Sequence, residues 1–229
     1  MSTKGLIKRT ENYNNLLEHV PDAYKRTLHM SEYLLVLQPN EELRDRIMHV
    51  KAEFADKYEA SMAKFLKPHI TLVNFMTWDM MEEKVTQRLR HIAMGTTPFK
   101  VELKDYGSFP THTIYINITT KVPIVNLVKE IRQAQRLMKA DPSFDPHFMM
   151  EPHLTIARKL LPWQYEKGWL EYSHKHFTGK FVADSMLLLK RRAGTKAYQI
   201  VGRYEFQNLP VATRQASLFG LAPSPPPAS

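Results

Sequence analysis

The sequence predicts an α+β fold in which an α/β unit is duplicated, so that two lobes are related by a pseudo-two-fold axis. The first observation is a repeated motif: Pro-His-Ile-Thr-Leu at residues 68–72 recurs as Pro-His-Leu-Thr-Ile at residues 152–156. The second is the order of the elements, because each motif lies in a predicted strand with a predicted helix before and after it. The two motif strands should therefore face each other across a central cleft.

The first lobe is predicted from apolar spacing and from residues that begin or end helices. A buried apolar strand at 33–37 ends before Pro39, and Asn40 is placed to cap the next helix. Thr77 or Asp79 is placed to cap the following one, which Gly95 ends. The predicted elements are a strand at 33–37, a helix at 41–58, the motif strand at 69–75 and a helix that begins after Thr77 or Asp79 and ends at Gly95.

The second lobe is predicted in the same way. Asp105 to Ser108 is rich in turn-forming residues, and Pro123 and Pro162 each suit the start of a helix. The predicted elements are strands at 99–103 and 112–118, a helix at 123–139, a loop at 141–147, the motif strand at 153–159, a helix at 163–176, and strands at 181–189 and 197–206 around a turn at 191–195.

Composition divides the chain into three parts: an N-terminal arm at 1–30, the bilobal domain at 31–207 and a flexible tail at 208–229, which is rich in Pro and Ser at its end. The net charge is +9, which suits an anionic partner such as nucleic acid. The absence of Cys excludes disulfides and thiolate chemistry. No apolar run is long enough to span a membrane, and no signal peptide is recognisable, so we expect a cytoplasmic protein. We also expect a monomer.

Each motif places a histidine and a threonine on one face of a strand, because residues two apart share a face. His69 is paired in this way with Thr71, and His153 with Thr155. Shuffling the composition gives roughly 0.05 expected matches to Pro-His-x-Thr, so two matches indicate function. A single motif would be better explained by a structural strand whose histidine donates a hydrogen bond to a neighbouring carbonyl.

Two histidines beside one phosphodiester can divide acid–base work. A neutral imidazole takes a proton from the attacking water, and a protonated imidazole gives one to the leaving oxygen. The threonine hydroxyls can donate to the non-bridging oxygens. This chemistry needs no metal, and the sequence does not decide which histidine is the acid.

The two motifs, read together with the order of elements, resemble the 2H phosphoesterase superfamily, in particular its bacterial RNA 2′,5′-ligase and cyclic phosphodiesterase branch, over residues 31–207. The resemblance implies two antiparallel sheets around a cleft, with His69 and His153 as catalytic residues and Thr71 and Thr155 as phosphate-binding residues. It also implies hydrolysis of 2′,3′-cyclic phosphates or 2′,5′-phosphodiester linkages in RNA ends or small nucleotides, without a cofactor or metal. Ligation would be the reverse of that chemistry.

Other residues near the motifs are weaker candidates. Arg158 and Lys67 are possible substrate contacts, and Lys159 is a possible outer phosphate contact. Arg158 is one position out of phase with Thr155, so pairing with a carboxylate away from the cleft is an equal alternative. The remaining candidates are a histidine expected to be a bystander and three aromatic residues that either stack a base or belong to the core: His112, Phe75, Tyr115 and Trp163.

Metal-dependent hydrolysis is the rival enzyme hypothesis for a chain with 10 His. The sequence has no His-Glu-x-x-His motif and no dense carboxylate motif. His174 and His176 are two apart on a predicted helix, so they should face different directions.

The tail carries a separate signal. Gln215, Leu218 and Phe219 are similar to the short peptide by which bacterial DNA polymerases and repair proteins bind the sliding clamp. The alternative is that Leu218 and Phe219 pack on the domain itself. This signal supports an alternative function from another class, a nucleic-acid-binding or clamp-tethered adaptor without turnover.

Overall fold

The computed structural model describes residues 29–65, 67–141, 144–192, 195 and 197–210. The N-terminal arm, except for its last two residues, and the clamp-like residues Gln215, Leu218 and Phe219 lie outside these ranges. The elements are β1 (Met30–Leu37), α3 (Glu41–Lys57), α4 (Met62–Phe65), β2 (Ile70–Trp78), η1 (Asp79–Met81), α5 (Glu82–Gly95), β3 (Phe99–Phe109), β4 (Thr113–Ile118), α6 (Lys121–Ile131), η2 (Arg132–Met138), β5 (His147–Phe148), β6 (His153–Arg158), α7 (Pro162–Tyr172), β7 (Thr178–Ala183), β8 (Ser185–Arg192) and β9 (Gln199–Glu205).

All strand pairs are antiparallel, and the strands are joined in the order β7-β3-β4-β6-β2-β1-β8-β9, with β5 paired to β2. The two motif strands, β2 and β6, are neighbours at the centre of this order. Their register consists of one pair, Ile70 opposite Leu154. The prediction of a mixed fold with large antiparallel sheet structure is confirmed, but the two predicted sheets are joined through this pair into one.

The strand order has the predicted pseudo-two-fold symmetry. On one side of the central pair lie β2, β1, β8 and β9, here called half-sheet 1, and on the other lie β6, β4, β3 and β7, here called half-sheet 2. Each half-sheet therefore carries one motif strand at its inner edge. An antiparallel pair is related by a local two-fold axis, so the motif strands meet in equivalent orientations.

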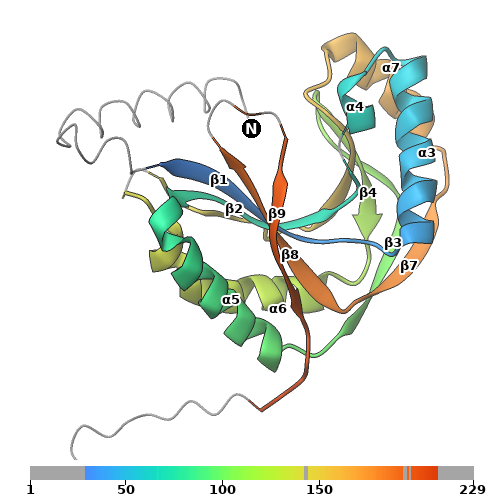
Figure 1. The fold of residues 1–229 in the computed structure, drawn as a ribbon. Coiled ribbons are helices and arrows are strands. Elements are labelled where there is room, and N and C mark those ends of the chain that lie inside the picture. Colours follow the sequence, from blue (N-terminus) through green and yellow to red (C-terminus); the bar gives the residue numbers. More distant parts are fainter. Residues whose placement is uncertain (1–28, 66, 142–143, 193–194, 196, 211–229) are drawn as a thin grey trace, which may run out of the picture.

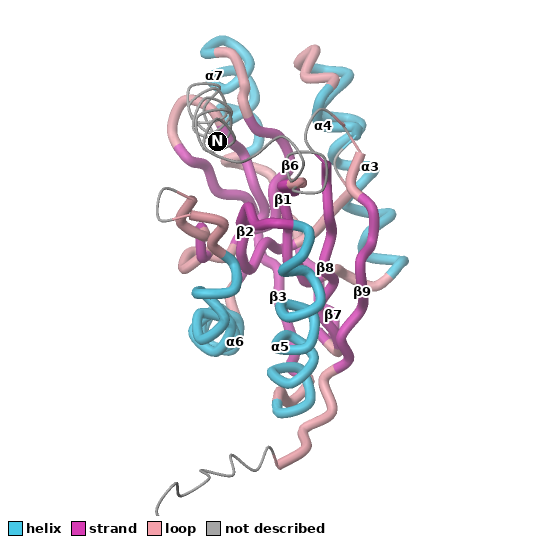
Figure 2. Tube along the Cα trace, turned by 60° about the vertical axis from the view of Figure 1, so that its left-hand side comes forward, coloured by secondary structure: helices cyan, strands magenta, loops and turns pink. Residues whose placement is uncertain are grey.

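Helices cover each half-sheet separately. α5 contacts β9 and α6 contacts β2, whereas α3 contacts β6 and β7, and α7 contacts β4. Figure 1 shows α5 and α6 gathered at one half of the molecule and α3 and α7 at the other, and the turned view in Figure 2 keeps the two groups apart. Apolar helix positions such as Ile47, Leu89 and Val128 are buried in the core.

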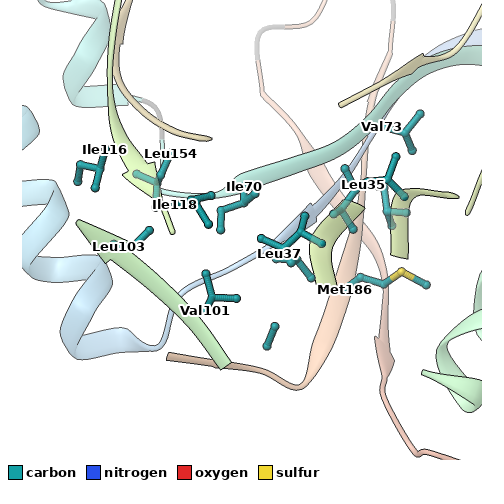
Figure 3. Close-up of a cluster of buried hydrophobic side chains, with 14 of the residues drawn as sticks. Leu35, Leu37, Ile70, Val73, Val101, Leu103, Ile116, Ile118, Leu154 and Met186 are labelled. Atoms are coloured by element: carbon teal, nitrogen blue, oxygen red, sulfur yellow. The ribbon is translucent and has the colours of Figure 1, made fainter. Parts of the chain in front are cut away.

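The hydrophobic core continues across the junction of the half-sheets. Ile70 and Leu154, the single pair between the motif strands, are both fully buried. Figure 3 shows them among apolar side chains of both halves, including Leu37 and Ile118. Burial of these side chains stabilises the junction although only one residue pair connects the strands there.

The largest error of the sequence prediction concerns its strand at 181–189. This segment forms two strands, β7 and β8, which lie in different half-sheets. The chain passes from one to the other at Asp184, whose carbonyl accepts a hydrogen bond from the Phe206 backbone amide. The apolar pattern of the sequence runs on without interruption from β7 to β8, because both strands bury the same kind of side chain. The pattern therefore does not indicate that the two strands belong to different half-sheets.

A second error concerns Asp105 to Ser108, which form part of β3 and not a turn between strands. The register of β3 against β4 shifts between Leu103 and Tyr106, which identifies a β-bulge. Asp105 has a φ of 55°, and its carboxylate accepts a hydrogen bond from the Phe177 amide. Turn-forming residues here bend a strand.

Smaller differences concern element ends. Asn40 precedes α3 but makes no side-chain cap hydrogen bond, and neither Thr77 nor Asp79 is the cap of α5. The sequence prediction did not include α4 or β5. Asn208, placed in the flexible tail, donates a backbone hydrogen bond to Thr96, so the chain is still held at the end of α5 there. Among the described helices, none has the length and apolar character needed to cross a membrane.

Candidate active site

The four motif residues lie on one face of the sheet, opposite the buried Ile70 and Leu154. Because Ile70 is opposite Leu154 in an antiparallel pair, His69 is placed opposite Thr155, and Thr71 opposite His153. Directly opposite side chains have Cβ atoms about 5 Å apart, and diagonal ones about 7–8 Å. The two histidines therefore occupy diagonal corners of a small rectangle, and the two threonines the other corners.

Both imidazoles are oriented by the backbone of their own strand. Nδ1 of His69 lies 2.8 Å from the carbonyl oxygen of Lys67, and Nδ1 of His153 lies 2.8 Å from that of Glu151. A carbonyl only accepts, so Nδ1 carries the proton in each ring. In the neutral form, Nε2 is then the nitrogen with a free lone pair. The hydrogen bond to a backbone carbonyl that a structural histidine would make is thus present in both motifs. The same bond fixes the tautomer that leaves Nε2 free for acid–base chemistry.

Each motif strand has a bulge directly after its threonine. In β2, Thr71 pairs with Val36 and Val73 with Leu35, so Leu72 is the extra residue. In β6, Ile156 is the extra residue against β4. A bulge shifts the alternation of side chains by one position.

The bulge at Ile156 brings Arg158 to the face of the histidines. Thr155 pairs with Tyr115, and Arg158 pairs with Thr113, which is two residues away on β4 and hence on the same face. Arg158 is exposed and forms no ion pair with a described carboxylate. The alternative in which it points away and pairs with an acid is therefore wrong for the described residues.

Aromatic side chains surround His153. The ring of Phe109 lies 4.8 Å from the imidazole centre and that of Tyr115 lies 5.0 Å from it, and the two aromatic rings are 4.7 Å apart. Gly107 makes room for the Tyr115 ring, because a Cβ there would lie 2.6 Å from that ring and 2.5 Å from the Asn117 side chain. Tyr115 was predicted as a candidate for base stacking, whereas Phe109 was missed. We call Phe109 and Tyr115 the aromatic platform.

The corresponding side of half-sheet 1 is polar. Because of the bulge at Leu72, Asn74 lies on the same face of the sheet as Thr71. The side-chain amide of Asn74 donates a hydrogen bond to the carboxylate of Glu32, at 2.8 Å. Glu32 also accepts from Arg191, whose guanidinium lies over the Tyr198 ring. Hydrogen bonds from Asn74 and the charge of Arg191 outweigh burial and lower the pKa of Glu32. The two half-sheets have equivalent strands and bulges, but the side chains beside their histidines differ.

Electrostatics distinguish the histidines. Burial is the main cause that lowers the pKa of His69 to about 4, and the charges of Lys51, Arg158 and His153 lower it further. Burial also lowers the pKa of His153, but the carboxylate of Glu151 acts in the opposite direction. His69 is therefore the histidine held more firmly in its neutral form.

The other predicted candidates are dispersed. Lys67 contributes its backbone carbonyl to His69, and its side chain is exposed, as is that of Lys159. Phe75 is a core residue stacked on Tyr33. Trp163 lies in α7, and His112 is hydrogen-bonded to Thr113.

No cluster of three or more His, Asp or Glu side chains suited to a metal ion occurs within the described residues. The predicted helix that would carry His174 and His176 ends at Tyr172, so both histidines lie beyond it. His176 forms a contact of 3.2 Å with Asp105.

The family of the chain follows from its sequence as well as from this geometry. The family described as "2'-5' RNA ligase superfamily" matches residues 39–195, which include both motifs and most of the sheet. The chain belongs to the 2′-5′ RNA ligase superfamily. A comparison with curated proteins gave no match.

Solved structures support the fold expected for the 2′-5′ RNA ligase superfamily. Escherichia coli LigT complexed with phosphate is similar with a TM-score of 0.54 and 13% identity, over 78% of this chain and 98% of LigT. TT0787 of Thermus thermophilus is similar with a TM-score of 0.53 and 16% identity, over 77% of this chain and 98% of TT0787. A structure named "phosphoesterase" is similar with a TM-score of 0.52 and 16% identity, over 77% of this chain and 98% of that protein. The predicted 2H phosphoesterase fold is confirmed.

Proposed function

We propose that the protein is a phosphodiesterase that hydrolyses 2′,3′-cyclic phosphates or 2′,5′-phosphodiester linkages of RNA ends or small nucleotides by two-histidine acid–base catalysis. Membership in the 2′-5′ RNA ligase superfamily supports phosphoester chemistry. The observation that carries the proposal is the diagonal arrangement of His69 and His153 on one sheet face, each with Nδ1 held by a carbonyl.

The diagonal arrangement suits displacement at phosphorus. A phosphodiester between the two rings would present its attacking and leaving oxygens to different histidines, as an in-line displacement requires. The hydroxyls of Thr71 and Thr155 would donate to the non-bridging oxygens, where negative charge must be accommodated. Arg158 would add a positive charge on the same face.

The charge environment supports one assignment of the acid and base roles. His69, the more neutral imidazole, would take a proton from water as its oxygen attacks phosphorus. His153 would give its proton to the 2′ or 3′ oxygen as the P–O bond breaks, which leaves a phosphomonoester and a free hydroxyl. His69 would then lose its proton to solvent and His153 would regain one. The carboxylate of Glu151 favours the protonated form of His153 and so supports this order.

The surroundings of the histidines favour a nucleotide substrate. The aromatic platform beside His153 can stack a base, an interaction worth about 1–3 kcal/mol per base. Structures of E. coli LigT complexed with 3'-AMP and with NADP+ show that a protein of this fold binds nucleotides. The net charge of +9 would also attract RNA.

The test is hydrolysis of an oligonucleotide that ends in a 2′,3′-cyclic phosphate, in the presence of EDTA. The wild type is compared with His69→Ala and His153→Ala, each checked for folding. His91→Ala is the matched control, because this histidine is exposed on α5 and belongs to neither motif. We expect turnover by the wild type and the control, and loss of at least about 10²-fold in kcat in both motif variants.

Three outcomes would contradict the proposal in different ways. Loss of wild-type activity in EDTA would support metal-dependent hydrolysis. Full activity of either motif variant would exclude the two-histidine mechanism. No turnover of this substrate or of 2′,5′-linked oligoadenylate, together with RNA binding, would favour the adaptor without turnover.

A further inference from the structure

Lys51 is a buried cation that the mechanism above does not use. It lies on the apolar stripe of α3, between Ile47 and Phe54, and its exposed fraction is 0%. Its Nζ donates one hydrogen bond, at 3.0 Å, to the carbonyl oxygen of Thr155. No described carboxylate forms an ion pair with it, and its pKa is lowered to about 8, mainly by burial and then by the charge of Arg158.

A lysine at this place is not explained by packing. Removing an ammonium from water is costly when no acid compensates it, and an apolar side chain of similar size would stabilise the core more. α6, which leads into the second motif strand as α3 leads into the first, has a wholly apolar buried stripe: Ile124, Leu127, Val128 and Ile131. The buried charge of Lys51 in α3 therefore indicates a function at this position other than packing.

The hydrogen bond to Thr155 occurs where the sheet is irregular. β6 carries its extra residue directly after Thr155, and β2 and β6 share only the pair of Ile70 and Leu154. Regular ladder bonds are interrupted at such a bulge. At the equivalent bulge of β2, the carbonyl of Leu72 accepts from the backbone amide of Met149, at 2.9 Å, beside β5. In half-sheet 2 the bonded carbonyl lies one position earlier relative to the extra residue, on Thr155, and its donor is a lysine side chain.

We propose that Lys51 is a positioning residue of the active site, which holds the bulge behind Thr155 from beneath the sheet and places its charge at the residue opposite His69, the proton acceptor. This inference rests on the proposed function. Lys51 adds to the burial of His69 and to the effect of Glu151 on His153, which together make half-sheet 1 the base side of the site and half-sheet 2 the acid side. The two histidines thereby acquire different roles although their own strands are equivalent.

The charged and titratable groups that face His69 come from two elements. Lys51 faces it from α3, and Arg158 and His153 face it from β6. The remaining partner is neutral, the carbonyl of Lys67 on its own strand. Removal of Lys51 therefore leaves Arg158 as the principal nearby cation, so the effect on His69 should be partial and upward in pKa.

The experiment compares three variants of the full chain with the wild type. Lys51→Met removes the charge and the hydrogen bond with little change in volume. Lys51→Gln removes the charge but keeps a donor for Thr155, and remains usable if the methionine variant does not fold. Lys57→Met is the matched control, because Lys57 lies on the same helix but is exposed and paired with Glu171. The readouts are the pH profile of kcat/KM and the titration of His69 by NMR.

We expect Lys51→Met to lower kcat by about tenfold or more and to move the acidic limb of kcat/KM, and the His69 titration, upward by about half a pKa unit. Lys51→Gln should show the same upward shift with a smaller loss of kcat, and Lys57→Met should resemble the wild type. A His69 titration unchanged in both Lys51 variants would overturn the proposal even if activity fell. If the wild type has no turnover, the proposed function fails, whereas the NMR titration still decides the effect of Lys51 on His69.

Discussion

At the scale of single residues, each histidine is oriented first by its own strand. The Nδ1 bonds of His69 and His153 both reach back two residues to a carbonyl, so they depend on local backbone geometry. This is why the motif could be recognised from sequence. The difference between the histidines comes from the burial of His69, from Glu151 beside His153, and from charges such as that of Lys51, which no local pattern placed near His69.

The threonine hydroxyls can be tested without disturbing the strands. Valine has nearly the shape of threonine and suits a β-strand. We expect Thr71→Val and Thr155→Val each to lower kcat on the order of 10²-fold, because each removes a donor to a non-bridging oxygen. Steady-state kinetics on the cyclic-phosphate oligonucleotide measures this, with Thr119→Val, outside the site, as the control. A change in KM alone would show that the hydroxyls bind substrate without stabilising the transition state.

The pH dependence should be bell-shaped with its optimum on the acid side. The base, His69, loses its proton as the pH rises through about 4, and activity increases. The acid, His153, has a pKa below its ordinary 6.5, and activity falls as it in turn loses its proton. The profile of kcat/KM reports the free enzyme, so its maximum should lie between about pH 4 and 6.5. A maximum above pH 7 would contradict the assignment.

At the scale of elements, the bulges decide which side chains reach the site. The strict alternation used for the sequence prediction places Arg158 on the far side of β6, and the extra residue at Ile156 reverses that placement. Bulges leave no clear composition signal when the extra residue is an ordinary apolar one. The sequence prediction therefore placed the histidine and threonine of each motif on the correct shared face. It did not place Arg158 correctly, because Arg158 follows the bulge.

The aromatic platform depends on the absence of a side chain at position 107 of β3. Its added Cβ would lie within 2.6 Å of both Asn117 and the Tyr115 ring. We expect Gly107→Ala to fold but to displace Tyr115 and raise KM by about fivefold or more, as partial loss of base stacking. Gly202→Ala in β9 is the control, since its Cβ would meet the Tyr204 hydroxyl at 3.0 Å. An unchanged KM would show that the platform does not contact the substrate.

At the scale of the whole molecule, the order of the elements could be predicted from sequence, but the topology could be predicted only in part. Apolar periodicity is local, so α3, α5 and the motif strands were found within a few residues although the predicted capping residues were not confirmed. Pairing is not local, and the assignment of β7 and β8 to opposite half-sheets depends on contacts that no single segment encodes. The joining of the half-sheets at Ile70 and Leu154 was missed for the same reason.

The net charge predicts how substrate length affects binding. A chain with +9 should bind a longer RNA through more phosphates and release more counterions. We expect KM for an RNA oligomer to rise roughly tenfold between about 50 and about 300 mM NaCl, and KM for a cyclic mononucleotide to rise much less. If KM rose equally with salt for both substrates, the protein would recognise only the terminal nucleotide of the RNA.

The position of β8 has a consequence for synthesis on the ribosome. β1 pairs with β8, which follows it by about 150 residues, so the outer edge of β1 stays open until nearly the whole described chain has been made. Half-sheet 2 is complete once β7 emerges, whereas half-sheet 1 must wait for β8 and β9. An unpaired strand edge is a site of aggregation. Nascent chains that stop after Ala183 should therefore require chaperone protection, which chains that extend beyond Glu205 no longer need.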